Sequence, residues 1–256
     1  MKLLILGGTA FLGKVVATQA LQHGYDVTCL ARGSSTPPEG VRFISADRDD
    51  KTALEQVSNQ SWDAVIELTS IPSHARQAVA QLTVQHWVFV SSASVYADFS
   101  QPEQAESAEI VPPDANPHNY GGAKVACEQS LPASSTIIRP GLIGGYGDWT
   151  SRSGYYPWRF AHPTGKSVLV PALDFPTAMI DVDDLAAWIL HCAKHQYTEV
   201  FNATGPTTTL AEVFQLCREL TDFTGDVQVL DDPTLVNPWM GPKSLPLWVG
   251  HPQWRY

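Results

Sequence analysis

The stretch Met1–Gly13 constrains the fold of this chain more than any other. Lys2–Leu6 is a short apolar run without a helical period, a glycine-rich turn follows at Gly7–Gly13, and a helical pattern begins at Lys14. This order predicts a buried parallel strand, a tight turn and a helix N-terminus. Free amides and the positive end of the helix dipole favour phosphate there, so we expect a dinucleotide pyrophosphate. The alternative is an ordinary strand-to-helix corner of another α/β protein.

The composition limits the class of protein. A chain of 256 residues with 44% hydrophobic residues can form one large α/β domain, or a nucleotide-binding domain with a small second lobe. A net charge of −10 and the lack of a Lys/Arg cluster argue against a nucleic-acid surface. Without a membrane-length apolar run or a secretory signal pattern, we expect a soluble, cytoplasmic protein.

Cysteine and histidine spacing gives no metal or disulfide signal. The four cysteines are far apart and form no C-x-x-C pair, which predicts reduced core residues. His191 and His195 are four residues apart on an expected helix, but the glutamate of a metalloprotease helix is missing. We therefore predict two solvated histidines and no metal.

Strands and helices alternate along the chain, which predicts an α/β fold with a doubly wound parallel sheet. The expected strands are 2–6, 26–31, 41–45, 64–68, 87–90, 136–138, 168–170 and 200–203. The expected helices are 14 to about 23, 74–82, 120 to about 131, 185 to about 194 and 210 to about 220, the last opened by a capping box at Thr209–Glu212.

The ends of the second and third strands bear on the cofactor. An acid at the end of the second strand would bind the adenosine ribose of NAD, whereas an arginine accommodates the extra phosphate of NADP. This chain has Arg32, with Ser34 close behind, so we favour NADP over NAD; the alternative is an exposed arginine at a strand end. Asp47 either contacts the adenine edge or caps the next turn, and both alternatives stay open.

Two further segments supply candidate chemistry. Ser91, Ser92 and Ser94 follow the fifth strand, and Tyr120 and Lys124 lie on one face of a later helix. The carboxyl ends of parallel strands share an edge, so these groups and the glycine turn can meet in one cleft. Tyr120 is the candidate proton donor or acceptor, Lys124 favours its phenolate and can hold the nicotinamide ribose, and Ser92 polarises the substrate oxygen.

The less regular segments carry weaker predictions. Residues 97–119 form an expected long loop, of a kind that often borders active sites. An aromatic-rich segment then includes Tyr146, Trp149 and Tyr155, which either wall a substrate pocket or pack a small lobe. No clear period runs through residues 225–256.

The chain resembles the short-chain dehydrogenase/reductases, specifically the extended or atypical branch called the NAD-dependent epimerase/dehydratase family. The resemblance rests on segments spread over most of the chain: Gly7–Gly13, Val90–Tyr96, Tyr120 with Lys124, Arg139–Gly141, Ile180–Leu185 and Phe201–Gly205. It implies a seven-stranded Rossmann fold with a small C-terminal substrate-binding lobe. The implied division is 1–140 with 176–205 for the nucleotide core, and 141–175 with 206–256 for the smaller lobe.

The resemblance also implies roles for individual residues. Catalysis is expected from Ser92, Tyr120 and Lys124. The expected cofactor-binding residues are Gly7, Thr9, Ala10, Phe11, Leu12, Gly13, Arg32, Ser34, Asp47, Thr69, Ser70, Ser91, Lys124 and Pro140. The expected substrate-binding residues are Ser94, Tyr146, Trp149 and Tyr155.

Three departures from the family pattern stand out. Ala10 replaces a glycine, the asparagine-rich helix after the fourth strand is absent, and the further helix usual after Pro246–Trp248 is missing, which bears on the completeness of the substrate lobe.

These features favour an NAD(P)-dependent oxidoreductase that reduces a carbonyl or oxidises an alcohol on a small or sugar-like substrate. The alternatives are a nucleotide-sugar epimerase or dehydratase with tightly bound cofactor, and a non-catalytic NADP-binding sensor or scaffold. The expected partners are a small-molecule substrate and, as the resemblance implies, a second copy in a homodimer, with neither nucleic acid nor membrane.

Overall fold

The protein forms two compact units in the computed structural model, which describes residues 1–100, 103–230 and 247. The first unit comprises Met1–Ala97, Ala105–Gly141 and Val182–Ala203. The second comprises Asp98–Gln104, Leu142–Asp181 and Thr204–Tyr256. The chain therefore returns to the first unit at Val182, later than the expected residue 176.

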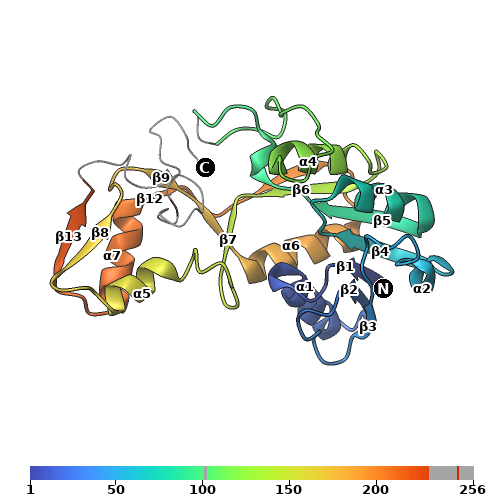
Figure 1. The fold of residues 1–256 in the computed structure, drawn as a ribbon, viewed down its shortest axis with the longest axis horizontal. Coiled ribbons are helices and arrows are strands. Elements are labelled where there is room, and N and C mark those ends of the chain that lie inside the picture. Colours follow the sequence, from blue (N-terminus) through green and yellow to red (C-terminus); the bar gives the residue numbers. More distant parts are fainter. Residues whose placement is uncertain (101–102, 231–246, 248–256) are drawn as a thin grey trace. The chain divides into compact units, whose positions relative to one another are not determined.

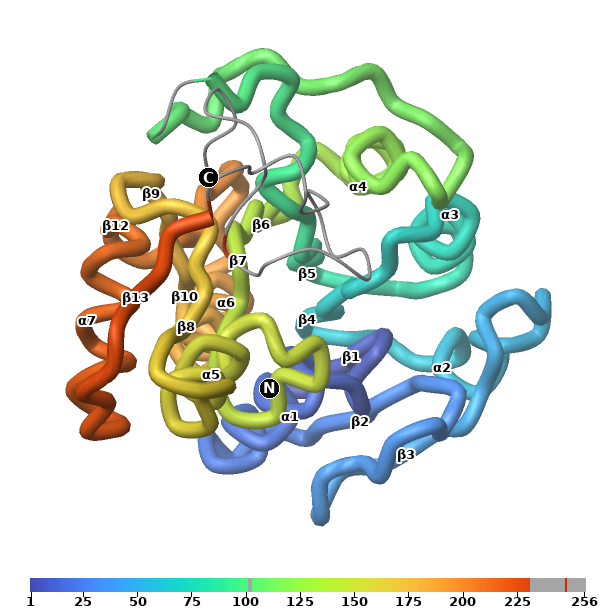
Figure 2. The backbone as a smooth tube through the Cα atoms, turned by 60° about the vertical axis from the view of Figure 1, so that its left-hand side comes forward, coloured from blue at the N-terminus to red at the C-terminus, as the bar shows by residue number. Residues whose placement is uncertain are grey.

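A seven-stranded sheet forms the centre of the first unit, and every neighbouring pair in it is parallel. Its order is β11-β6-β5-β4-β1-β2-β3, and Figure 2 shows the succession from β3 to β6. The strands are β1 (Lys2–Leu6), β2 (Asp26–Ala31), β3 (Arg42–Ser45), β4 (Ser61–Glu67), β5 (Thr83–Val90), β6 (Thr136–Pro140) and β11 (Val200–Ala203). The predicted doubly wound sheet is confirmed.

Helices cover both faces of this sheet. Helix α1 (Phe11–Gln22) packs against α6 (Val182–His195), and α3 (Pro72–Gln81) packs against α4 (Tyr120–Glu128). Figure 1 shows the two pairs on opposite sides of the sheet. A sheet buried on both faces needs apolar side chains on both, which explains the continuous apolar runs of its central strands.

Several boundaries differ from the predicted ones. β4 begins at Ser61 and β5 at Thr83, three and four residues before the predicted starts, because strand pairing continues into segments that contain polar residues and lie outside the apolar runs. Helix α6 begins at Val182, so Asp183 and Asp184 lie inside its first turn rather than before it. The one-turn helix α2 (Glu55–Ser58) was not predicted, because four residues carry no measurable period.

The second unit contains short two-stranded ladders and two helices. β7 (Leu142–Gly144) pairs with β10 (Met179–Asp181), β8 (Ser167–Val170) with β13 (Asp226–Val229), and β9 (Pro176–Thr177) with β12 (Thr208–Thr209). Helices α5 (Tyr155–Ala161) and α7 (Leu210–Leu220) pack against each other. The Thr209–Glu212 capping box is confirmed, whereas β7, α5 and β13 lie where the sequence shows no clear pattern.

Aromatic side chains fill the core of the second unit. Tyr156, Phe160, Phe214 and Phe223 are buried, and the Tyr156 and Phe214 ring centroids are 4.7 Å apart.

Two further features bear on the class of protein. Among the described residues, no helix is long and apolar enough to cross a membrane. The four cysteines are all free and buried, as predicted.

Candidate active site

The glycine turn lets helix α1 begin in contact with the end of β1. Gly7 has a φ of +103°, a region that favours glycine. A Cβ added at Gly13 would lie 2.3 Å from the Gly7 carbonyl oxygen, and one added at Gly8 would lie 2.4 Å from the Cys29 sulfur. Neither position accepts a side chain without a rearrangement, so the glycines set the close packing of this corner.

The first turn of α1 fits a bound phosphate. Its N-cap residue, Ala10, offers no side-chain cap, and the first turn contains no acidic residue. The leading amides and the positive helix end therefore face no competing anion of the helix itself. Ala10 is exposed and Thr9 is buried, whereas Phe11 and Leu12 are half-buried beside the turn. This corner fits the pyrophosphate of a dinucleotide.

The glycine turn lies where the strand order reverses, between β1 and β4. Leu68, directly after β4, donates its amide to the Leu6 carbonyl at 3.3 Å. The Leu68 side chain also leaves no room for a side chain at position 13, since a Cβ added at Gly13 would lie 2.9 Å from Leu68 Cδ1. Ligands of doubly wound sheets bind at such a switch point, outside the carboxyl ends of the strands.

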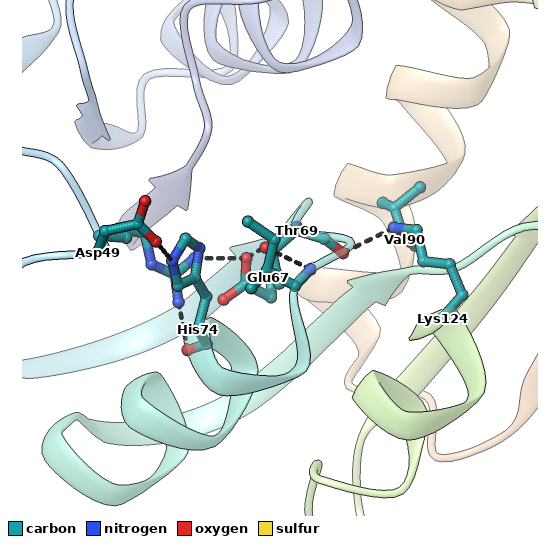
Figure 3. A network of polar contacts seen from close by, with 8 residues as sticks. Asp49, Glu67, Thr69, His74, Val90 and Lys124 are labelled. Atoms are coloured by element: carbon teal, nitrogen blue, oxygen red, sulfur yellow. Dashed lines mark hydrogen bonds and ion pairs between the residues drawn. The ribbon is translucent and has the colours of Figure 1, made fainter. Parts of the chain in front are cut away.

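Lys124 ties helix α4 to the carboxyl ends of two strands. Its buried Nζ donates to the Thr69 carbonyl at 2.8 Å and to the Val90 carbonyl at 2.7 Å, as Figure 3 shows. The ammonium also lies 4.8 Å from the centroid of the Phe89 ring. Burial lowers the pKa of Lys124 from 10.5 to about 8, against the opposing effect of nearby Cys127, Glu67 and Glu128.

This lowered pKa predicts a particular pH dependence of stability. From pH 8 to 10.5 the unfolded chain keeps the Lys124 proton while the folded protein loses it, so the free energy of unfolding contributed by Lys124 rises with pH over this window. We expect the stability difference between wild type and Lys124→Met to shift in favour of wild type as the pH rises through this range, measured by urea unfolding. A difference that stays constant with pH would contradict the lowered pKa.

Tyr120 begins helix α4 and is 47% exposed. The Lys124 ammonium lies 6.0 Å from the centroid of its ring, which confirms that the two side chains share one helical face. Asn119 caps the helix by accepting from the Gly122 amide at 3.4 Å. An accessible phenol therefore stands beside a buried cation.

The serine cluster lies against the same helix. Ser92 caps the short helix η1 (Ala93–Val95): its Oγ accepts from the Ser94 amide at 3.1 Å and lies 3.2 Å from Ser94 Oγ. A Cβ at Gly121 would lie 2.3 Å from the Ser94 carbonyl oxygen, so only glycine permits this approach of α4 to η1. Gly121 is a site residue that the sequence patterns above did not predict, although the Gly-Gly pair after Tyr120 is a visible signal.

Ser91 belongs to a buried ion-pair network. Its Oγ donates to Glu128 Oε1, and Glu128 also accepts from Arg139 at 2.8 and 3.0 Å. Arg139 Nη1 reaches Tyr96 Oη at 3.2 Å, and Tyr96 donates to Asn202 Oδ1 at 2.6 Å. This network joins β5, α4, β6 and β11, and a cofactor contact for Ser91 stays a prediction.

The other predicted cofactor residues of the first unit occupy strand ends. Arg32 and Ser34 are exposed directly after β2. Asp47 accepts from the Asp49 amide at 3.1 Å, a contact that corresponds to its predicted turn-capping role, while a contact with adenine stays a prediction. Thr69 Oγ1 accepts from the Ile71 amide at 3.1 Å. Ser70 is half-buried after β4, and Pro140 is buried at the end of β6.

The predicted aromatic substrate residues lie in the second unit. Tyr146 is 97% exposed and Trp149 is 79% exposed, whereas Tyr155 packs edge-on against Tyr156 with ring centroids 5.1 Å apart. Asp148 orders this loop by accepting from the backbone and side chains of Thr150 and Ser153. Substrate contacts for these three aromatic residues stay predictions.

The two helix histidines form no larger ligand set. The His191 and His195 ring centroids are 4.3 Å apart on α6. Within the part of the chain that the structure describes, no group of three or more His, Cys, Asp or Glu side chains could hold a metal ion.

The N-terminal part of the chain matches a known protein family. Residues 3–81, which include the glycine turn, match the model of the NAD dependent epimerase/dehydratase family. Over these residues the chain resembles that family. The match agrees with the predicted resemblance at the glycine turn, the first of the segments on which that prediction rests.

Individual relatives extend the comparison to most of the chain. The photosystem II assembly factor Ycf39 of Trieres chinensis is 32% identical over 37% of this chain, and the match spans only 35% of its length. A UDP-glucose 4-epimerase of Corynebacterium glutamicum is 25% identical over 86% of this chain and 80% of its own. The Thermus thermophilus UDP-glucose 4-epimerase, solved in complex with NAD, has the same fold, with a TM-score of 0.70 and 18% identity over 89% of this chain and 86% of that one.

Proposed function

We propose that this protein is an enzyme that transfers a hydride between NAD(P) and an alcohol/carbonyl pair. One observation carries the proposal: the exposed phenol of Tyr120 stands beside the buried ammonium of Lys124, 6.0 Å from ring centroid to Nζ. Both residues belong to the same unit as the glycine turn. The family match over residues 3–81 supports a dinucleotide at that turn.

Residues of the first unit would hold the dinucleotide. The turn at Gly7–Gly13 would bind the pyrophosphate. Lys124 would hold the nicotinamide ribose, together with Thr69 and Ser70 in the loop after β4. When bound, NAD(P) supplies or accepts the hydride.

Each side chain then has a defined task. In the reducing direction the Tyr120 hydroxyl donates a proton to the carbonyl oxygen as hydride reaches the carbon, and in the oxidising direction the phenolate accepts the alcohol proton. The Lys124 cation stabilises that phenolate electrostatically. Ser92 donates a hydrogen bond to the substrate oxygen and polarises it.

Arg32 supports NADP as the cofactor. It is an exposed cation directly after β2, where a 2′-phosphate would need one. We expect Arg32→Asp to weaken NADPH binding by about 1.5–3 kcal/mol, the value of a hydrogen bond to a charged group, and NADH binding much less. Fluorescence titration with both nucleotides measures this. Equal losses for NADPH and NADH would remove the phosphate role from Arg32.

A nucleotide-sugar epimerase is the second candidate. The observation that favours it is the match to a UDP-glucose 4-epimerase over 86% of this chain. Epimerases retain and regenerate their cofactor, so the purified protein should carry bound NAD(P) and interconvert UDP-glucose and UDP-galactose without net nicotinamide turnover.

One experiment separates the candidates. The purified protein is first analysed for bound nucleotide, and then assayed with NADPH against a panel of aldehydes and ketones and, separately, with UDP-sugars. Stoichiometric NADPH oxidation supports the dissociable-cofactor reductase, and sugar interconversion supports the epimerase. Nucleotide binding with neither activity would leave the sensor or scaffold and reject both enzymes.

A further inference from the structure

A buried ion pair lies at the carboxyl end of β4, one loop away from Lys124. Glu67, the last residue of this strand, is fully buried, and its Oε1 accepts from Arg48 Nη1 at 2.8 Å. Arg48 also donates to the His74 carbonyl, and His74 Nε2 lies 2.8 Å from Asp49 Oδ1 (Figure 3). These contacts fix the Glu67 carboxylate from the side of β3 and α3.

The pair does not satisfy all its own polar atoms. Glu67 Oε2 and Arg48 Nε are buried without a hydrogen-bond partner among the described residues. A buried carboxylate is costly, and replacing such a pair by apolar residues is often neutral or stabilising. Stability alone is therefore a weak reason for an ion pair here.

The Thr69 peptide connects this carboxylate to the candidate active site. Its amide donates to Glu67 Oε1 at 3.0 Å, and its carbonyl accepts from Lys124 Nζ at 2.8 Å. Figure 3 shows Thr69 between the two charged side chains. The carboxylate thereby orients the loop that supplies one of the two carbonyls holding the ammonium.

The negative charge of Glu67 also favours the charged form of Lys124, in addition to the hydrogen bonds through Thr69. The titratable groups that affect Lys124 are Glu67 on β4 and Cys127 and Glu128 on its own helix, with Tyr120 one turn before it. Two arginines lower the pKa of Cys127: Arg48, in the turn after β3, and Arg76, on α3. Each of the two carboxylates is paired with an arginine, Glu67 with Arg48 and Glu128 with Arg139. Glu67 differs in that the Thr69 peptide joins it to Lys124 through two hydrogen bonds.

We propose that Glu67, held by Arg48, is a positioning residue that orients the Thr69 carbonyl toward Lys124 and keeps the Lys124 ammonium charged. The importance of Glu67 to catalysis rests on the proposed function, whereas its effect on Lys124 does not. The complete burial of Glu67 and its pairing with Arg48 fit this supporting role.

The test follows Lys124 itself rather than turnover. Lysines are labelled with ¹³C at Cε, the Lys124 signal is assigned by its loss in Lys124→Met, and the signal is titrated by NMR. We expect the titration midpoint of Lys124 to fall by about one to two pH units in Glu67→Gln, because a unit charge about 8–12 Å away at an effective dielectric near 20 has an effect of that size. Glu67→Gln keeps the acceptor oxygen, so it removes mainly the charge.

Matched variants keep the outcome decisive. Asp63→Asn removes a carboxylate from the same strand, four residues or about 13 Å earlier, and should leave the Lys124 midpoint unchanged. If Glu67→Gln alone does not fold, the neutral double variant Arg48→Gln/Glu67→Gln replaces it, with the same expected direction. An unshifted midpoint in the folded variant overturns the inference. A shifted midpoint in a protein that transfers no hydride upholds the inference and rejects the proposed function.

Discussion

Tyr120→Phe is expected to lower kcat by about 10²–10⁴-fold, the usual contribution of a positioned acid or base. The change removes one oxygen from an exposed side chain, so the fold of α4 and its contacts with η1 should persist. Cofactor affinity should remain within about twofold, since the residues assigned to the pyrophosphate are untouched. Steady-state kinetics over a pH series, together with nucleotide titration, measure both quantities.

A matched control separates this effect from a general loss of tyrosine hydroxyls. Tyr25→Phe makes the same chemical change between α1 and β2, outside the candidate site, and should retain full activity. If Tyr120→Phe turns over as fast as wild type, Tyr120 has no acid/base role and the proposed mechanism is wrong. If the variant instead loses nucleotide affinity in proportion to kcat, Tyr120 acts in binding.

The architecture of the first unit could be predicted because its physical signals are local. Buried parallel strands must be apolar on both faces, so β1, β2 and the end of β5 stand out as continuous apolar runs. The glycine turn is equally visible, since glycine is favoured by the φ of +103° at Gly7 and by the close approach of the Gly7 carbonyl oxygen at Gly13. The second unit offers few such signals, because its strands are two to four residues long and its helix α5 is shorter than two full periods.

The candidate site could be predicted only where chemistry leaves a sequence signature. Tyr120 and Lys124 are one helical turn apart, so their shared face follows from spacing alone. The pairing of Arg48 with Glu67 joins residues 19 positions apart, and that of Glu128 with Arg139 depends on where α4 packs. Such contacts are set by the tertiary fold, and the local sequence carries no pattern that indicates them.

Arg139→Met is expected to lower the free energy of unfolding by about 3–5 kcal/mol, the usual cost of leaving one charge of a buried pair uncompensated. The side chains of Arg139 and Glu128 are 5% and 9% exposed, and two hydrogen bonds of 2.8 and 3.0 Å join them. Loss of the guanidinium also removes the donor to Tyr96 Oη and to the Glu106 carbonyl. Urea unfolding followed by tryptophan fluorescence measures the change.

Two further variants show whether the uncompensated charge is the cause. Glu128→Gln/Arg139→Met removes both charges while leaving an acceptor for Ser91, and should recover at least part of the lost stability. Arg42→Met removes an exposed arginine from β3 and should change the free energy of unfolding by less than about 0.5 kcal/mol. A double variant as unstable as Arg139→Met would mean that the lost hydrogen bonds to Tyr96 and Glu106, rather than the unpaired Glu128 carboxylate, account for the destabilisation. In that case Arg139 would stabilise the fold chiefly by joining β6 to the residues before α4, and the charge of Glu128 would be incidental to it.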